Sequence, residues 1–180
     1  MPIMPGTHEL GPAAGSLRVE TKRSGAAAKA GHDLVIEVRD WSGVLIVGED
    51  GGETSLVLSA DSGSMEVVEG SGGIMELGNE DKVEIKKTLE EETLPPGPVE
   101  FRSTEVTPAA DGARLDVTGE LELNGVTHPL SFELELGDDG SLTGTAMLKQ
   151  SDWGIKPYSG LFGTLKVRDE VRVIGRAAAS

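Results

Sequence analysis

Residues 119–136 alternate between apolar and polar side chains in two successive runs. In GELEL the leucines fall on odd positions, at Leu121 and Leu123, and in LSFELEL the apolar residues fall on even positions, from Leu130 to Leu136. The segment NGVTHP separates the two runs. Because successive side chains on a β-strand point to opposite faces, each run predicts a strand with one buried and one solvated face. The stretch therefore predicts a pair of amphipathic strands whose apolar faces must be covered.

The same period of two continues through most of the chain. Near the N-terminus, for example, Leu17, Val19 and Thr21 share one face of a predicted strand. Sustained alternation favours an antiparallel sheet with one dry face. We expect eight to ten strands in all, with a bend near residues 40–43 and a final hairpin formed by the last two. Their expected ranges are 16–23, 34–47, 54–60, 64–70, 99–106, 113–123, 130–136, 141–149, 163–167 and 171–177.

One segment, residues 79–94, predicts a short helix instead. Ile85 and Leu89 lie four residues apart and share a helical face, with Val83 nearby. Asn79 can cap the N-terminus. The prolines that follow at positions 95 and 96 end the helix.

Many amphipathic strands and one helix predict an all-β fold. A long open sheet would expose two edges, and closure removes them. We therefore expect a single antiparallel eight-stranded β-barrel over residues 15–178, with residues 1–14 as a flexible N-terminal tail. A two-sheet sandwich is the main alternative.

The composition of the inward faces bears on what the barrel contains. Aromatic residues make up only 3% of the chain, and the inward positions are mostly Leu, Val, Ala and Gly. An eight-stranded barrel is either filled by side chains or holds one small ligand. Small side chains and few rings favour an elongated apolar cavity, although leucine alone can fill a narrow barrel.

Charge and residue types exclude several functions. The net charge is −15, which is unfavourable for binding nucleic acid. Residues 149–180 are an exception, with six basic residues against three acidic ones. These basic residues either protect strand edges or form a subsite for an anionic group. There is no cysteine, and three histidines without ligand spacing predict neither a metal site nor a catalytic residue.

The N-terminal sequence and the hydropathy bear on localisation. MPIMPGTHELGPAAG has no basic region followed by an apolar one, unlike a secretory signal. No run approaches the roughly 18 apolar residues of a spanning helix. We expect a cytoplasmic protein without stable membrane insertion, unless a leader has been removed.

Two places could contact a ligand. His32 follows Gly31 at the start of an apolar strand and could donate to an anionic or quinone-like head group, or simply serve as a loop residue. The segment 151–163 carries Trp153, Tyr158 and Phe162 together with Lys156. This aromatic loop either gates a ligand at the mouth of the barrel or plugs one end of the core.

The order and spacing of several short motifs resemble the YceI-like family. The G-x-L-x-x-x-G-V-T-x-P stretch runs from Gly119 to Pro129, and the S-D-W-G-I segment occupies 151–155. A P-x-x-x-F-x-S-x-x-V stretch after the helix includes Phe101, and WSG at 41–43 stands for the early F-x-G of the family. The resemblance implies a lipocalin-like barrel that binds long isoprenoid chains, with no catalytic residues carried over. Many relatives are periplasmic.

The resemblance and the residues together imply a non-enzymatic function. We expect binding, transport or sequestration of an amphiphilic isoprenoid lipid, either a polyprenyl phosphate or an isoprenoid quinone, with no cofactor. An enzyme acting on a small hydrophobic substrate in the same barrel is the alternative, and a filled structural barrel is a third. If the barrel is not fully closed, its unpaired strand edges could also join two subunits as a homodimer. The expected ligand-binding residues are His32, Trp41, Phe101, Phe132, Trp153, Lys156, Tyr158 and Phe162.

Overall fold

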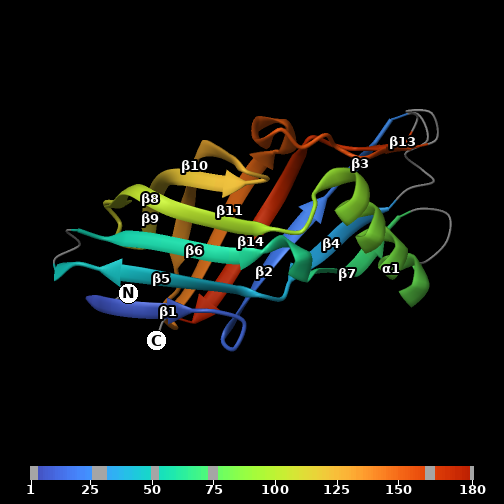
Figure 1. The fold of residues 1–180 in the computed structure, drawn as a ribbon. Helices are drawn as coiled ribbons and strands as arrows, with labels where there is room; N and C mark the ends of the chain where they lie inside the picture. The colour runs from blue at the N-terminus through green and yellow to red at the C-terminus, as the bar shows by residue number, and fades with distance from the viewer. Residues whose placement is uncertain (1–3, 26–31, 50–52, 73–76, 161–164, 179–180) are drawn as a thin grey trace.

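The structure is a computed structural model that describes residues 4–25, 32–49, 53–72, 77–160 and 165–178 (Figure 1). Within these residues the chain is almost entirely β-strand, with one α-helix and three short helical turns. The strands are β1 (Gly6–Leu10), β2 (Gly15–Thr21), β3 (Arg23–Ser24), β4 (Asp33–Val38), β5 (Trp41–Val47), β6 (Ser55–Asp61), β7 (Met65–Ser71), β8 (Pro98–Pro108), β9 (Arg114–Leu123), β10 (Val126–Leu136), β11 (Ser141–Lys149), β12 (Ser159–Gly160), β13 (Leu165–Val167) and β14 (Glu170–Ala178). The helix is α1 (Asn79–Thr88), and the turns are two of 3₁₀ type (Ser62–Ser64 and Gln150–Trp153) and one of π type (Leu89–Thr93).

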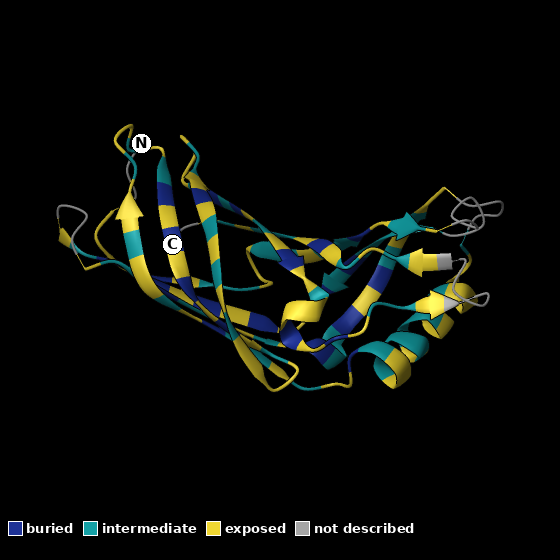
Figure 2. Cartoon of the chain, turned by 90° about the horizontal axis from the view of Figure 1, so that it is seen from above, coloured by how far each residue is buried: buried dark blue, intermediate teal, exposed yellow. Residues whose placement is uncertain are grey.

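Eleven of the strands form one strongly curled antiparallel sheet (Figures 1 and 2). Its order is β1-β5-β6-β8-β9-β10-β11-β14-β2-β4-β7, and a smaller sheet has the order β12-β13-β3. The expectation of an all-β, antiparallel fold with one short helix is confirmed. The main sheet has eleven strands rather than eight: the expected strand 34–47 is divided into β4 and β5, and an additional strand, β1, forms near the N-terminus.

The bend lies in the hairpin formed by residues 33–71. β4 and β5 are separated only by Arg39 and Asp40, slightly before the expected position, and the 3₁₀ turn Ser62–Ser64 separates β6 from β7. Hydrogen bonds bridge the bend, from the Arg39 N–H to the Ser64 carbonyl at 3.2 Å and from the Asp61 N–H to the Asp40 carbonyl at 3.0 Å. β5 and β6 therefore lie near one end of the strand order, and β4 and β7 lie at the other end. Because the bend connects the two ends, the sheet curls round on itself.

The N-terminal residues differ from the expected tail over 1–14. Gly6–Leu10 forms β1 and pairs with β5, with His8 opposite Leu45. The His8 side chain is buried, and its Nε2 atom lies 2.7 Å from the Met4 carbonyl oxygen. A strand of five residues contains too few alternating apolar and polar positions to be recognised in the sequence.

The β9–β10 pair has a tighter turn than the NGVTHP connection suggests. Asn124 and Gly125 have φ values of 55° and 72°, so these two residues form a two-residue hairpin turn and β10 begins at Val126. Pro129 consequently lies within β10, opposite Glu120. It is accommodated because β11 pairs only with Glu133–Leu136, so the missing N–H of Pro129 removes no bond to a second neighbour.

The prediction that residues 163–177 form a final hairpin is wrong. β13 pairs with β12 and β3 in the smaller sheet, whereas β14 pairs with β11 and β2 in the main one. The Arg168 N–H donates to the Lys22 carbonyl at 2.8 Å, which holds the chain against the N-terminal strands as it crosses between the two sheets.

The expected helix over 79–94 is present as α1 followed by the π turn. Ile85 and Leu89 pack against the core as expected, but Val83 is 67% exposed. The N-cap is Gly78 rather than Asn79, and the Asp81 carboxylate accepts the Gly78 N–H at 2.9 Å. The helix lies beside β7, at the end of the molecule where β3, β4 and β13 also gather (Figure 1).

Burial follows the alternation of the sequence (Figure 2). In β9, Leu115, Val117 and Leu121 are buried, while the alternate residues Asp116, Thr118 and Glu120 are exposed. Gly119 keeps this inward register without a side chain, because an added Cβ would lie 2.6 Å from Cζ of Phe101 and 2.2 Å from the Arg102 carbonyl oxygen. The glycine therefore makes room for the Phe101 ring on the concave side of the sheet.

Candidate functional site

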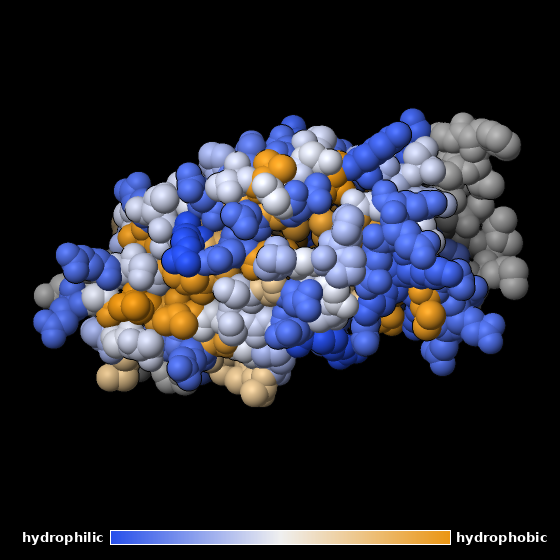
Figure 3. Space-filling view, viewed as in Figure 1, coloured by the Kyte–Doolittle hydropathy of each residue, from blue (hydrophilic) through white to orange (hydrophobic). Residues whose placement is uncertain are grey.

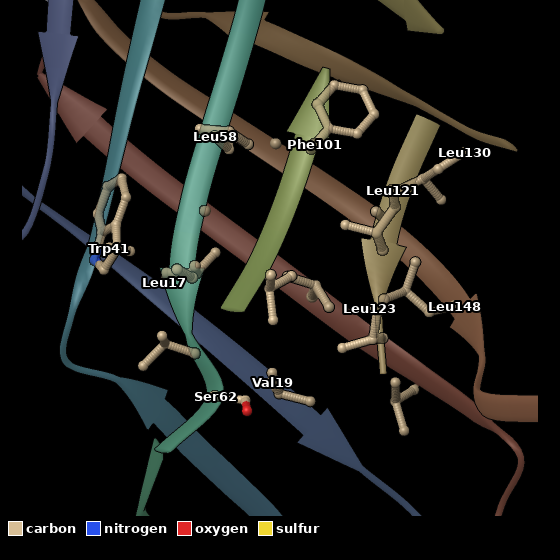
Figure 4. A pocket seen from close by; sticks show the side chains of 18 of the residues that line it. Leu17, Val19, Trp41, Leu58, Ser62, Phe101, Leu121, Leu123, Leu130 and Leu148 are labelled. Carbon is tan, nitrogen blue, oxygen red and sulfur yellow. The ribbon is translucent and has the colours of Figure 1, made fainter. Parts of the chain in front are cut away.

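The concave side of the curled sheet lines an apolar cavity of about 270 Å³, which we call the inner chamber. Each of the eleven strands of the main sheet contributes at least one lining residue. Figure 4 shows side chains from facing strands converging on this space, among them Leu17 and Val19 of β2 and Leu121 and Leu123 of β9. The volume exceeds the roughly 150 Å³ that is enough for a benzene ring in an apolar protein cavity. The expected apolar cavity is therefore present, and a completely filled barrel does not describe this fold.

Four aromatic residues expected to contact a ligand line the inner chamber. They come from four different segments and are Trp41, Phe101, Phe132 and Trp153. Phe101 and Phe132 lie side by side with ring centroids 5.2 Å apart and planes inclined by 56°. This tilted geometry is a favourable arrangement for two aromatic rings.

Trp153 belongs to the wall of the chamber. It is 1% exposed, and its Nε1–H donates to the Leu121 carbonyl at 2.8 Å. The Asn124 amide donates to the Trp153 carbonyl at 3.1 Å, and the His128 ring packs edge-on at 5.0 Å between centroids. Of the two roles considered for the 151–163 segment, these contacts favour plugging the core for Trp153.

A second cavity of about 330 Å³, the outer chamber, adjoins the first. It lies at the α1 end of the molecule and is lined by residues of α1, the π turn, β2, β3, β4 and β13. The two chambers share five lining residues, which lie between them: Thr21, Ile36, Leu89, Thr93 and Gln150.

The outer chamber contains two more of the expected residues. His32 and Tyr158 both line it, each partly exposed. Lys156 does not belong to the site, because it is exposed and borders neither chamber. The 3₁₀ turn and Gly154 at φ 68° precede Ile155, which is buried and lines the inner chamber, whereas Lys156 beside it faces solvent. Phe162 lies outside the described residues.

Sequence reasoning did not name seven other polar or charged residues that line the outer chamber, among them Thr21, Arg23 and Lys166. Thr21 carried a signal, since it is a hydroxyl residue on the apolar stripe that continues from Leu17 and Val19. Lys166 belongs to the basic C-terminal region, but nothing in the sequence distinguishes it from the five other basic residues there.

The described residues contain neither a cluster of metal-ligating side chains nor a membrane-spanning helix. Among them, no three histidine, aspartate or glutamate side chains come together in a way that could hold a metal ion. No helix in the described part of the chain has the length and apolar character needed to cross a bilayer.

The outer surface over α1 is largely hydrophilic in Figure 3, while apolar side chains gather at the opposite end of that face, where β5 carries the exposed Val44 and Ile46.

The sequence matches the model of a family described as YceI-like domain over residues 17–179. A UPF0312 protein of Pseudomonas aeruginosa is 45% identical over 65 residues, which cover 31% of this chain and 33% of that protein. A UPF0312 protein of Pseudomonas paraeruginosa is 42% identical over the same length. The chain thus spans about a third of the length of the curated relatives it matches.

A solved structure shares the architecture over most of the chain. The crystal structure of BcnA from Burkholderia cenocepacia superposes with a TM-score of 0.64 at 15% identity, covering 90% of this chain and 94% of BcnA. A YCEI protein of Campylobacter jejuni is similar over 67% of this chain, with 17% identity and a TM-score of 0.47. At these identities the likeness to BcnA establishes the fold alone.

Proposed function

The chain belongs to the family of YceI-like domains, known as polyisoprenoid-binding proteins, and on that premise we propose that it binds an amphiphilic isoprenoid lipid without chemical turnover. The role would be transport or sequestration of a polyprenyl phosphate or an isoprenoid quinone. The observation that carries the proposal is the inner chamber, an apolar space of about 270 Å³ that shares five lining residues with a second chamber, which contains polar side chains. An apolar tail and a polar head group match the two environments.

Burial of the tail supplies the binding free energy in this proposal. Each methylene removed from water contributes about 0.8 kcal/mol, so an isoprene unit of five carbons contributes roughly 4 kcal/mol when fully buried. Association costs about 4–15 kcal/mol in lost translational and rotational freedom. A tail of a few units is therefore enough to offset this cost without any strong polar contact, and tails shorter than two units should bind weakly.

The first experiment is organic extraction of the purified protein followed by mass spectrometry. We expect a prenyl lipid in the extract at a substantial fraction of the protein concentration. The delipidated protein should then bind added prenyl quinone or prenyl phosphate saturably. Absence of a prenyl lipid from the extract, together with no saturable binding of either compound, would contradict the proposal.

A further inference from the structure

The turn between β9 and β10 is an exposed asparagine–glycine sequence that the proposed function does not use. Asn124 and Gly125 form this turn, and both are exposed. Among the described residues other than glycine, Asn124 alone has a positive φ, at 55°. A Cβ added at Gly125 would meet no atom within 4 Å, so the space beside this residue is open. The main chain of the turn is therefore accessible to water and hydroxide.

An asparagine that precedes a glycine has a specific chemistry. The main-chain nitrogen of the following residue can attack the side-chain carbonyl carbon, Cγ, of the asparagine. A side chain on that following residue hinders the approach, and glycine has none. The sequence contains one other asparagine, Asn79, which is followed by Glu80 and begins α1. Asn124 is therefore the more reactive of the two asparagines.

The Asn124 side chain also holds a wall residue of the inner chamber in place. Its Nδ2–H donates to the Trp153 carbonyl at 3.1 Å. Trp153 is 1% exposed, lines the inner chamber and donates its Nε1–H to the Leu121 carbonyl of β9. A side-chain amide on an exposed turn therefore fixes the main chain of a buried residue of the chamber wall.

We propose that Asn124 is a site of spontaneous deamidation, and that its conversion breaks the hydrogen bond that holds Trp153. Hydroxide removes the proton from the Gly125 N–H, and the nitrogen then forms a bond to Cγ of Asn124. The bond between Cγ and Nδ2 breaks, and the amide nitrogen takes a proton from water and leaves as ammonia, which restores the hydroxide. Water opens the resulting cyclic succinimide at Cγ to give aspartate, or at the main-chain carbonyl carbon to give isoaspartate.

The folded turn limits the rate of this reaction. The Asn124 side chain is held toward Trp153, so ring formation requires the hydrogen bond between them to break and the turn to open. Local opening of an exposed segment costs less free energy than global unfolding. Conversion therefore proceeds slowly in the native protein without unfolding of the sheet. It accelerates as the pH rises, because the attacking nitrogen must lose its proton.

Both products remove the contact with Trp153, and isoaspartate has a further effect. An aspartate carboxylate has no proton to donate, so its oxygen would face the Trp153 carbonyl oxygen without a hydrogen bond. Isoaspartate adds a carbon atom to the main chain of a tight turn that joins the paired residues Leu123 and Val126. The longer main chain should therefore disturb the pairing of β9 with β10 as well.

The first experiment incubates the purified protein at mildly alkaline pH and then cleaves it after lysine. The two asparagines fall on separate peptides, residues 30–82 and 88–149. We expect mass spectrometry to show a growing deamidated fraction, with both aspartate and isoaspartate, in peptide 88–149, while peptide 30–82 stays largely unchanged. Asn124→Gly, which suits the positive φ, should abolish the change. No conversion, equal conversion of both peptides, or the same conversion in Asn124→Gly would overturn the assignment.

The second experiment tests the consequence for Trp153. Asn124→Asp should lower the Tm by about 2–4 °C, as for one lost hydrogen bond of ordinary strength. Asn79→Asp is the matched control, because a carboxylate at the start of α1 is favourable and should not lower the Tm. In a Trp41→Phe background Trp153 is the remaining tryptophan, and its emission should shift to longer wavelength in Asn124→Asp. Unchanged emission would overturn the coupling to Trp153 even if the Tm falls.

The consequence for a lipid rests on the proposed function, whereas the two experiments above use no lipid. Converted protein should bind a prenyl quinone more weakly than fresh protein, because Trp153 belongs to the wall of the inner chamber. Equal affinity of fresh and converted protein would overturn the link between the turn and the chamber. Failure of both samples to bind the quinone would count against the proposed function alone, since deamidation is measured separately by mass spectrometry.

Discussion

Two buried hydroxyl groups line the inner chamber, and they differ in their hydrogen bonding. Ser62 is 5% exposed, and its Oγ accepts the Gly97 N–H at 2.9 Å and donates to the Gly97 carbonyl at 3.1 Å. Thr21 is 9% exposed and has no partner for its Oγ1 among the described residues. The two residues form a matched pair, because removal of each hydroxyl should change the stability of the ligand-free protein in opposite directions.

A buried polar group without a partner costs about 1–3 kcal/mol in lost hydration. Thr21→Val replaces this hydroxyl by a methyl group of similar shape and should therefore raise the free energy of unfolding by about 1 kcal/mol. Ser62→Ala removes the acceptor of a buried N–H and should lower the free energy of unfolding by roughly 1–3 kcal/mol. For a chain of this length, 1 kcal/mol corresponds to a change in Tm of about 2–4 °C.

The assay is thermal unfolding of the delipidated proteins, followed by circular dichroism. The expected order of Tm is Thr21→Val above wild type and Ser62→Ala below it. A lower Tm for Thr21→Val would refute the reasoning, because it would show that Thr21 makes a hydrogen bond in the ligand-free protein.

Three further predictions test the fold around the inner chamber. Gly119→Ala should destabilise the protein by about 1–3 kcal/mol in chemical denaturation, since its Cβ would lie 2.2 Å from the Arg102 carbonyl oxygen and 2.6 Å from the Phe101 ring; unchanged stability would show that the contact relaxes freely. Trp153→Phe should cost roughly 1–3 kcal/mol in the same assay, because the Leu121 carbonyl loses its donor at 2.8 Å; a neutral effect would show that this hydrogen bond contributes no net stability. Leu45→Ala should cost about 2–5 kcal/mol, because Leu45 is 0% exposed and its truncation leaves a cavity; a loss below 1 kcal/mol would mean that the site collapses around the smaller residue.

Local patterns predicted much of the fold. In β9 every second residue is buried, so the period of two identified both the strand and its inner face. The bend between β4 and β5 coincides with a change in the alternation. The buried residues occupy even positions in β4, at Ile36 and Val38, and odd positions in β5, at Trp41 and Leu45. The helix was predictable from Ile85, Leu89 and the prolines that follow. The short strand β1 was not, because a few residues carry too little periodicity.

The candidate site was less predictable, since it is assembled from distant segments. Aromatic residues such as Trp41 and Phe101 could be named because large rings on inward positions tend to line any interior space. The outer chamber instead combines Thr21, Arg23, Glu84 and Lys166, which meet only through the pairing of β13 with β3 and the packing of α1 near β7. Whether a loop residue such as Lys156 faces a chamber or the solvent depends on the geometry of the turn, which a periodic sequence pattern does not predict.

If the apolar chamber of the curled sheet holds a lipid tail, a larger side chain that fills the chamber should weaken lipid binding. Ala146 of β11 lines the chamber, while the adjacent Thr145 is exposed on the other face of the same strand. Binding of a prenyl phosphate and a prenyl quinone to the delipidated protein can be followed by fluorescence of Trp41 and Trp153, which both line the chamber. We expect saturable binding to wild type and to Thr145→Phe, and at least a roughly tenfold weaker affinity for Ala146→Phe with an unchanged circular dichroism spectrum. An affinity of Ala146→Phe equal to that of wild type would show that the lipid tail does not occupy this chamber.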